Sequence, residues 1–444
     1  MKQIPALSRR NFMKTLVMAS SAAAIDWTSF GQLARAIPDK AAFPVVVIGA
    51  GLGGLVSAAY LAKHGFEVTL LEQHAVPGGY ATSFDRGDFT FDVSLHATVA
   101  EHAMPQAILT DLGIWDRLKT AYTPELRRII TPEFDVTLPA KNPEGVKKEL
   151  SRVFPHETKG IYGFYGEMEQ VIAELWGGKR FDTSMMARLE PLTLEQWMSL
   201  HVKDPDVKYC LGIFSGYYGL QPENLNALFY AVATGEYLVH GGQYYKARSQ
   251  DLSNALAGCV EADHGKAHYH TEVGRILLDQ NRHVSGVTDK TGKTFPARAV
   301  IANCSIPTLF DHLLPGDVIP PEFDREVKKR RVSLSSFIVF LGLNKTISQV
   351  RDYEIELEES HDPYGDLLSP KADPAESAIG ITIYDNLFKG YSPPGKTTLT
   401  LMCLSDSEPW KKFEADYFNN RKESYQREKE RIAKRFIQRV EKLF

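Results

Sequence analysis

The spacing of apolar positions changes along the chain and marks the elements that we expect. Residues 45–48 form a continuous apolar run, which is typical of a strand buried on both faces of a parallel sheet. Apolar residues then recur at helical spacing over 55–62, Gly65 follows where a helix commonly ends, and 66–71 is again strand-like. This order predicts a strand, helix and strand of a βαβ unit.

Two segments with other sequence patterns follow this unit. Residues 98–245 read as mostly helical and rich in aromatic side chains, most of which we expect in the core, with those at 214–218 and 244–245 facing a substrate. Beyond residue 330, the runs SSFIVFLGL, SAIGITIYD and TTLTLMCLS predict an antiparallel sheet. The acidic stretch between the first two runs, DYEIELEESHDPYGDLLSPKADPAES, is expected to be a solvated excursion. The fold class is therefore α/β with an additional α+β part.

The C-terminal residues predict an amphipathic helix. Ile432, Phe436, Val440 and Leu443 stand at helical spacing in a segment dense in charge. Such a helix either packs on the fold or contacts a membrane surface. No glycine follows Gly395 in this sequence.

Composition narrows the class of protein. The 444 residues are 43% hydrophobic and 24% charged with a net charge of −4, which is ordinary for a globular protein and predicts no affinity for nucleic acid. The four cysteines form no C-x-x-C pair, which argues against a zinc ribbon, a dithiol redox pair or c-type haem, although an oxidising compartment would permit one or two disulfides. No segment is expected to span a membrane.

The first 36 residues resemble a twin-arginine export signal. SRRNFMK at 8–14 precedes a short apolar run, and Ala34-Arg35-Ala36 fits a cleavage site, so we expect the mature protein to begin near Ile37. The twin-arginine machinery would then deliver a folded protein to the periplasm, which a cofactor loaded in the cytoplasm would explain. The alternative is a cytoplasmic protein with a chance pair of arginines.

A glycine-rich turn joins the first strand to its helix. Gly49, Gly51 and Gly54 give G-x-G-x-x-G, with Gly53 inside the motif, and glycines here let backbone amides approach a pyrophosphate at a helix N-terminus. Glu72 ends the second strand, where its carboxylate can accept hydrogen bonds from ribose hydroxyls and would repel a 2′-phosphate. Strand, turn, helix and acid together predict a dinucleotide site.

The residues after Glu72 resemble a flavoprotein superfamily that includes amine oxidases and phytoene desaturases. VPGGY carries a second glycine signature, FDVSLH looks most like the retinol saturase branch, and HYHTEVGRI with AVIAN resembles the family's return to its cofactor domain. The resemblance implies FAD rather than NAD. It implies that Gly78, Gly79 and Tyr80 run along the dinucleotide and that the backbone of Val273 contacts the adenine.

The same resemblance implies a division of the chain and a function. Residues 44–97 and 246–310 would form a discontinuous Rossmann-like FAD-binding domain, and 98–245 and 311–444 a substrate domain. The protein would desaturate, saturate or isomerise C=C bonds of a conjugated or isoprenoid hydrocarbon by hydride transfer at flavin N5. The electron acceptor would be a quinone, oxygen or a redox protein, since a periplasmic protein has no access to soluble NAD(P)H.

His96 is the candidate catalytic residue, by its place in FDVSLH. It would donate a proton or act as a polar partner of the flavin, the alternative being a histidine satisfied at a strand end. Asp92 would organise the loop. His264, His268 and His270 lack the acid or thiol of a complete site, so no metal is predicted.

Two other functions stay open. A flavin amine oxidase would share the nucleotide-binding segments. A non-catalytic or truncated flavin-binding protein is the second alternative, because the family normally continues into a last glycine-rich segment that closes over the flavin.

Overall fold

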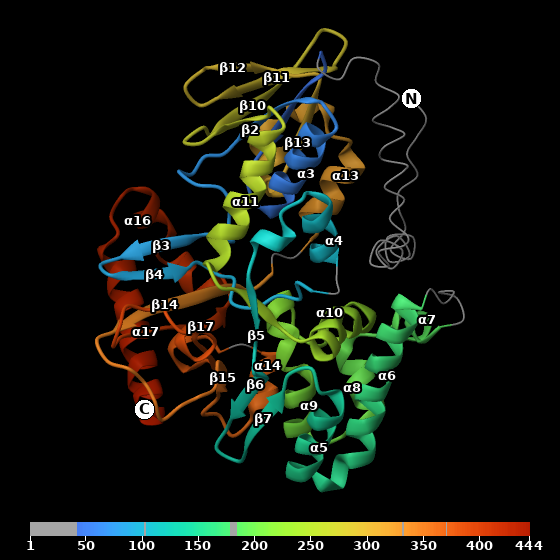
Figure 1. Ribbon diagram of the computed structural model, residues 1–444, viewed down its shortest axis with the longest axis vertical. Coiled ribbons are helices and arrows are strands. Elements are labelled where there is room, and N and C mark those ends of the chain that lie inside the picture. The colour runs from blue at the N-terminus through green and yellow to red at the C-terminus, as the bar shows by residue number, and fades with distance from the viewer. Residues whose placement is uncertain (1–41, 102–103, 178–183, 331–332, 370) are drawn as a thin grey trace.

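The computed structural model of the protein describes residues 42–101, 104–177, 184–330, 333–369 and 371–444 (Figure 1). The segment 1–36 that resembles an export signal lies outside the described residues. Among the residues that the structure does describe, no helix combines the length and apolar character needed to cross a bilayer. All four cysteines, Cys210, Cys259, Cys304 and Cys403, are free thiols.

A four-stranded parallel sheet forms the upper part of the molecule in Figure 1. Its order is β13-β1-β2-β9, with strands β1 (Pro44–Ile48), β2 (Glu67–Leu71), β9 (Lys266–His268) and β13 (Ala299–Ala302). Strand β13 therefore pairs with β1 although some 250 residues separate them in sequence.

Both faces of this sheet are covered, which explains the continuous apolar run of β1. Val45 and Val47 pack in a cluster with helices α3 (Leu52–Lys63) and α11 (Arg248–Ala262). Val46 and Ile48 pack in another cluster with the antiparallel sheet of β10 (Val273–Leu278), β11 (Val284–Asp289) and β12 (Thr294–Pro296). Successive side chains of a strand point to opposite faces of the sheet. The residues of β1 therefore pack alternately against these two layers, and an apolar side chain is needed at each position.

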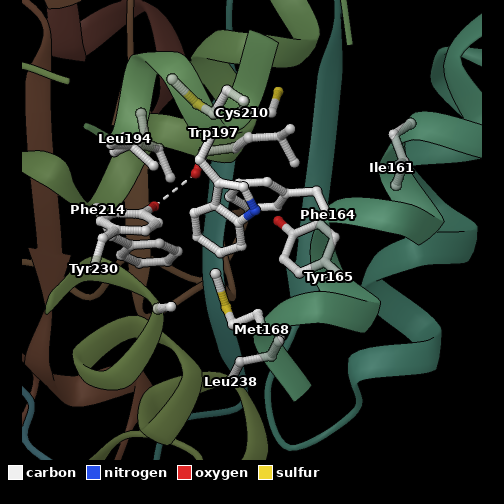
Figure 2. Packing of buried hydrophobic residues seen from close by; sticks show 14 of the residues in the cluster. Ile161, Phe164, Tyr165, Met168, Leu194, Trp197, Cys210, Phe214, Tyr230 and Leu238 are labelled. Carbon is white, nitrogen blue, oxygen red and sulfur yellow. Dashed lines mark hydrogen bonds between the residues drawn. The ribbon is translucent and has the colours of Figure 1, made fainter. Parts of the chain in front are cut away.

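A helical cluster fills the lower right of Figure 1. Its core packs around Trp197, whose ring centroid lies 4.1 Å from that of Phe164 (Figure 2). The helices are α5 (Pro143–Val153), α6 (Thr158–Trp176), α7 (Met185–Leu189), α8 (Leu194–His201), α9 (Pro205–Gly212) and α10 (Ala227–His240). Most aromatic residues of this segment are core residues, as the sequence predicts.

A six-stranded sheet adjoins these helices in the order β14-β17-β16-β15-β6-β7. Its strands are β14 (Ser335–Leu343), β17 (Thr397–Ser405), β16 (Ile379–Ile383), β15 (Glu354–Leu357), β6 (Glu125–Ile130) and β7 (Asp135–Pro139). The last two strands come from a segment expected to be mostly helical, as do β5 (Thr120–Tyr122) and β8 (Gln243–Tyr245).

The prediction of a solvated acidic excursion at 352–377 is wrong. Strand β15 lies inside the sheet, with Ile355 and Leu357 on the apolar face and Glu354 and Glu356 on the other face. Glu354 is buried and the Glu356 side chain is only 14% exposed, because Arg127 of neighbouring strand β6 pairs with both of them. A sequence pattern cannot show a counter-ion supplied from 227 residues away.

The C-terminal helix α17 (Glu423–Val440) packs against the same sheet through Ile432, Phe436 and Val440. Arg439, 1% exposed, donates hydrogen bonds to the carbonyl oxygens of Ala375 and Ser377 at 2.9 and 2.7 Å. The apolar face of α17 is thus covered by the protein itself.

Shorter elements complete the chain. They are β3 (Ser83–Arg86), β4 (Phe89–Asp92), α4 (Met104–Asp111), α12 (Ile306–Thr308), α13 (Pro321–Lys328), α14 (Pro363–Leu368), α15 (Glu408–Lys411) and α16 (Glu414–Phe418). The hairpin of β3 and β4 packs Phe84 and Phe91 on Phe340 of β14, which ties the six-stranded sheet to the dinucleotide-binding part.

Candidate active site

The glycine-rich turn after β1 has the form that a pyrophosphate requires. Gly49 has a φ of +92°, and a Cβ on Gly54 would lie 2.0 Å from the Gly49 carbonyl oxygen, so glycine is needed at both positions. The first helical hydrogen bond of α3 runs from the Leu55 N–H to the Gly51 carbonyl, which leaves the preceding amides of the helix without a partner in its ladder. Such free amides at a helix N-terminus attract phosphate groups.

The second glycine pair lies directly against this turn. The Gly78 N–H donates to the Ala50 carbonyl at 2.7 Å, and a Cβ on Gly79 would lie 3.3 Å from the Gly51 Cα. Tyr80 follows at 82% exposure. The structure thus brings both glycine signatures to one place.

Glu72 stands beside the turn and is buried. Its carboxylate accepts the Ala50 N–H at 2.7 Å and the His74 N–H at 2.9 Å, and a carboxylate has further acceptor positions for ribose hydroxyls. Val273 lies nearby in the cluster that holds Ile48, on the same side of the sheet.

Asn303 is a residue of this site that sequence reasoning missed. Its N–H donates to the Ile48 carbonyl, and its side-chain amide would meet a Cβ at Gly51, Gly53 or Gly54 at 3.2, 2.9 and 3.0 Å. The available signal was a polar residue directly after a predicted parallel strand, because the carboxyl edge of such a sheet is where ligands bind. The glycine cradle, the free amides, Glu72 and Asn303 fit FAD, whose pyrophosphate and ribose they would hold.

A cavity of about 420 Å³, here called the outer cavity, extends from the glycine segments to the helical cluster. Leu52 of α3 and Tyr80 line one end, and His96 lies at the other with aromatic side chains of the predicted 214–218 group. Its lining residues are Leu52, Tyr80, Ala81, Ser94, Leu95, His96, Ala97, Thr98, Val99, Phe214, Tyr217, Tyr218, Ala233, Thr234 and Tyr237. The other predicted aromatics, Tyr244 and Tyr245, are buried outside this lining.

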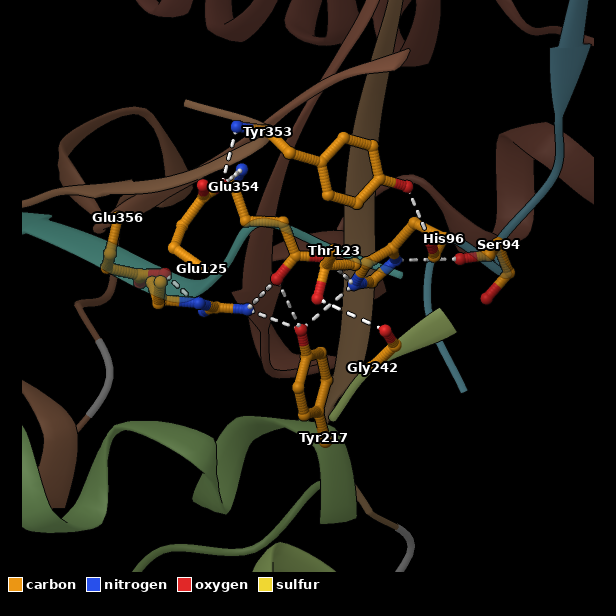
Figure 3. A network of polar contacts seen from close by, with 10 residues as sticks. Ser94, His96, Thr123, Glu125, Tyr217, Gly242, Tyr353, Glu354 and Glu356 are labelled. Carbon is orange, nitrogen blue, oxygen red and sulfur yellow. Dashed lines mark hydrogen bonds and ion pairs between the residues drawn. The ribbon is translucent and has the colours of Figure 1, made fainter. Parts of the chain in front are cut away.

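His96 belongs to a polar network behind this cavity (Figure 3). Its Nε2 lies 3.0 Å from the Tyr217 hydroxyl and 3.2 Å from Oε1 of Glu354, while its Nδ1 lies 3.2 Å from the Ser94 carbonyl oxygen. Tyr217 donates to Glu354 at 3.1 Å and accepts from Arg127 at 2.5 Å. Arg127 also pairs with Glu356 at 2.6 Å.

Neighbours hold both ring nitrogens of His96. The Ser94 carbonyl can only accept, so the Nδ1 that contacts it is a donor. Nε2 faces the Tyr217 hydroxyl, which can donate or accept, and lies near the Glu354 carboxylate. The ring is thus held between an aromatic hydroxyl and a carboxylate.

The charges behind His96 stabilise one another. Burial opposes the charge of Arg127, but Tyr217, Glu356 and Glu354 outweigh it and raise the pKa of the guanidinium well above its usual value. Burial raises the pKa of Glu356, although Arg127 opposes that shift. The Arg127 guanidinium also lies 5.1 Å from the Tyr217 ring centroid, which fixes the ring in place.

Asp92 holds the strand end that leads to His96. Its buried carboxylate accepts hydrogen bonds from the hydroxyls of Ser249, Ser83 and Tyr391 at 2.5, 2.9 and 2.6 Å. Asp92 therefore shapes the loop from β4 to His96, as expected from the sequence.

The three histidines at 264–270 do not form a cluster of metal ligands. No group of three or more His, Cys, Asp or Glu side chains in the described ranges is arranged to hold a metal ion. His268 instead packs on Phe295, with ring centroids 5.4 Å apart.

A parallel sheet whose first turn meets a second glycine pair, with a cavity beside them, defines a dinucleotide-binding protein. The chain belongs to the flavin containing amine oxidoreductase family, whose sequence model matches residues 52–428. The protein is thus a flavin-containing oxidoreductase, and its cofactor is FAD.

Relatives within this family differ in their substrates. The chain is 24% identical to all-trans-retinol 13,14-reductase of Danio rerio, covering 93% of this chain and 74% of that protein. It is 25% identical to a chloroplastic prolycopene isomerase of Arabidopsis thaliana, covering 90% and 68%.

Solved structures share the fold at low identity. An oxidoreductase from Methanosarcina mazei superposes with a TM-score of 0.63 at 17% identity, over 90% of this chain and 84% of that one. Putrescine oxidase bound to putrescine gives 0.55 at 15% identity, over 82% and 76%. These likenesses concern the fold.

Proposed function

We propose that this protein is an FAD-dependent oxidoreductase that acts on C=C bonds of a conjugated or isoprenoid hydrocarbon, by saturation, desaturation or isomerisation. The observation that carries the proposal is the lining of the outer cavity. Among the described residues this lining includes no Asp, Glu, Lys or Arg, and aromatic and aliphatic side chains form most of the wall around His96, together with Ser94, Thr98 and Thr234. Such a surface suits an apolar chain, whereas an ammonium group would find no carboxylate there.

Bound FAD supplies hydride transfer at N5 of its flavin ring. The chain's own residues orient an apolar substrate, exclude water with the aromatic walls, and place the His96 ring at the cavity surface. Saturation of a C=C bond consumes one proton in addition to a hydride, and His96 is the residue that would supply it. Tyr217 and Glu354 hold this ring in place.

The relatives support this choice of substrate. Names of two matched proteins refer to retinol and prolycopene, which are conjugated or isoprenoid polyenes, and each is matched over at least 90% of this chain. Putrescine oxidase is similar in fold, so an amine is the competing class of substrate.

The test compares polyenes with amines on the purified holoprotein. The flavin is reduced under anaerobic conditions and mixed with all-trans-retinol or prolycopene, and the polyene absorption band is followed together with flavin reoxidation. A shift of the polyene band with either compound is the expected result. Reduction of oxidised flavin by putrescine with release of peroxide, and no change in either polyene, would assign the protein to amine oxidation instead.

We further propose that the protein is exported in its folded holo form to the periplasm and that, in the desaturation direction, its reduced flavin passes electrons to a quinone or a redox protein. The Arg9-Arg10 pair supports export. Replacing both arginines by lysine should leave FAD-loaded protein in the cytoplasm, and cell fractionation measures this. Unchanged fractionation of the lysine variant would overturn the export proposal.

A further inference from the structure

A second cavity of about 100 Å³ shares Tyr217 with the outer cavity, and we call it the inner cavity. Tyr217 lines both cavities, and Arg127 and Glu356 form part of the inner wall. Figure 3 shows Tyr217 between His96 on one side and the guanidinium that pairs with Glu356 on the other. The inner cavity is therefore next to the proposed reaction centre.

Three hydroxyl groups of the inner wall have no hydrogen-bond partner among the described residues. They are Oγ of Ser215, the hydroxyl of Tyr209 and Oγ of Ser377, and the first two belong to residues that are only 1% exposed. A buried hydroxyl without a partner costs about 1–3 kcal/mol. Three such groups lining one cavity indicate a polar occupant, which is water or a ligand group.

The remaining wall defines the chemistry of that occupant. Apolar side chains supply a large part of it, namely Ile213, Leu220, Leu334, Leu367, Met402 and Leu404. Arg127 and Lys371 would repel an ammonium group in this cavity. The carboxylates of Glu356 and Asp366 would repel an anion. Burial raises the pKa of Glu358 to about 7, which makes this wall residue a partly neutral carboxyl group. An uncharged polar group on an apolar chain satisfies all of these conditions.

We propose that the inner cavity binds the hydroxyl group at one end of an isoprenoid substrate. The proposal rests on the proposed function, because it places the reacting bond of the same molecule beside His96. A hydroxyl donates one hydrogen bond and accepts two, and Ser215 and Ser377 can each donate and accept. Tyr217 lines both cavities, so the hydroxyl end and the reacting bond of one substrate would both lie near this residue.

The test uses a matched pair of ligands on the FAD-loaded protein. All-trans-retinol is compared with the hydrocarbon that carries a methyl group in place of its CH2OH, and each Kd is measured from the perturbation of the flavin spectrum. We expect the alcohol to bind at least about tenfold more tightly, since a site with buried polar groups discriminates against an analogue that leaves them unpaired. In Ser215→Ala, Ser377→Ala and Tyr209→Phe this ratio should fall towards one.

Ser151→Ala is the matched control, because its Oγ is also buried without a described partner but lies outside the inner cavity. It should leave the ratio unchanged. FAD content and Tm of each variant show that the fold is retained, and Tyr209→Phe keeps the ring even if a serine variant is unstable.

The outcomes separate the two proposals. If both polyenes bind and react equally and the variants only lower Tm, the inner cavity holds water alone and the inference is overturned, while the proposed function stands. If neither polyene binds, the proposed function fails, and the inference fails with it.

Discussion

The hydroxyl of Tyr217 lies 3.0 Å from Nε2 of His96 and donates to Glu354 at 3.1 Å, so one aromatic side chain connects the cavity histidine to the buried charges behind it. These residues come from three distant parts of the chain, and Tyr217 is the point at which they meet. The arrangement makes Tyr217 a positioning residue for His96.

Replacing Tyr217 by Phe should impair turnover without removing FAD. The variant keeps the ring over Arg127 but deletes the hydroxyl that His96 and Glu354 share, so His96 loses its fixed orientation. We expect kcat on a polyene to fall about tenfold or more and the pH profile to change, because general acid catalysis contributes roughly 10²–10⁴-fold. Steady-state kinetics from pH 5.5 to 9 and the flavin absorbance per chain check this.

Tyr218→Phe is the control for that change. Tyr218 lines the same outer cavity, but its hydroxyl bonds to Thr234 at 2.9 Å, away from the charged network. An equal loss of turnover and an equal change of pH profile in the two variants would contradict the positioning role.

Gly51→Ala should abolish FAD binding while the fold survives. An added Cβ would lie 3.2 Å from the Asn303 side-chain amide, and a small shift of that side chain relieves this contact, so the fold tolerates the methyl group. The same methyl group would block the close approach of the pyrophosphate to the backbone. We expect FAD content to fall about tenfold or more and the Tm of the cofactor-free protein to change by no more than a few degrees. Gly316→Ala, whose Cβ meets nothing within 4 Å, should keep both values, and retained FAD in Gly51→Ala would refute the assignment.

Glu125→Gln should stabilise the protein at high pH. Burial raises the pKa of Glu125 from 4.5 to about 7, partly offset by the N–H groups of Glu354 and Tyr353. Between pH 4.5 and about 7, Glu125 is ionised in the unfolded chain but still protonated in the folded protein. The free energy of unfolding therefore falls as the pH rises through this range, and it stays at the lower value above about pH 7. Gln retains an acceptor for both N–H groups but cannot ionise.

We therefore expect the variant to exceed the wild type by about 2 kcal/mol at pH 8 and by much less at pH 5. Thermal unfolding at both pH values measures the difference. Glu157→Gln, which also removes a carboxylate that accepts two backbone N–H groups but at a half-buried position, is the matched control. A gain that is equal at pH 5 and pH 8 would contradict the prediction for Glu125.

Arg439→Met should destabilise the attachment of the C-terminal helix. The substitution removes hydrogen bonds to the Ala375 and Ser377 carbonyls and the ion pair with Glu359. Each hydrogen bond from a charged group contributes about 1.5–3 kcal/mol, so loss of the two carbonyl contacts should cost about 3 kcal/mol or more. Lys442→Met is the control, since it removes an exposed partner of the same Glu359 and should cost less than about 1 kcal/mol in thermal or urea unfolding.

The cofactor-binding half of the fold could be predicted because its signals are local. The turn from Gly49 to Gly54 and the strand ending at Glu72 lie within 24 residues, and their backbone requirements select particular residue types. The return of the AVIAN segment to the sheet is implied by its resemblance to the family, and the pairing of β13 with β1 confirms it.

The network around His96 was not predictable beyond His96 itself. Arg127, Tyr217 and Glu354 carry no local motif, and a strand with glutamates at alternating positions normally indicates a face exposed to water. The position of Glu354 and Glu356 inside the fold depends on Arg127 from β6. That strand was not predicted, because the residues around it are rich in aromatics and read as helical. Pairings between remote segments are what a single sequence leaves undetermined.

The pairing of β1 with β13 has a consequence for synthesis on the ribosome. The nascent chain exposes the glycine turn early, but the strand that completes one side of β1, and Asn303 beneath the turn, emerge only after about 300 residues have been made. Until then β1 is an unpaired edge that cannot form a stable cofactor cradle and is open to misassociation. Capture of FAD must therefore be a late event in the maturation of this protein.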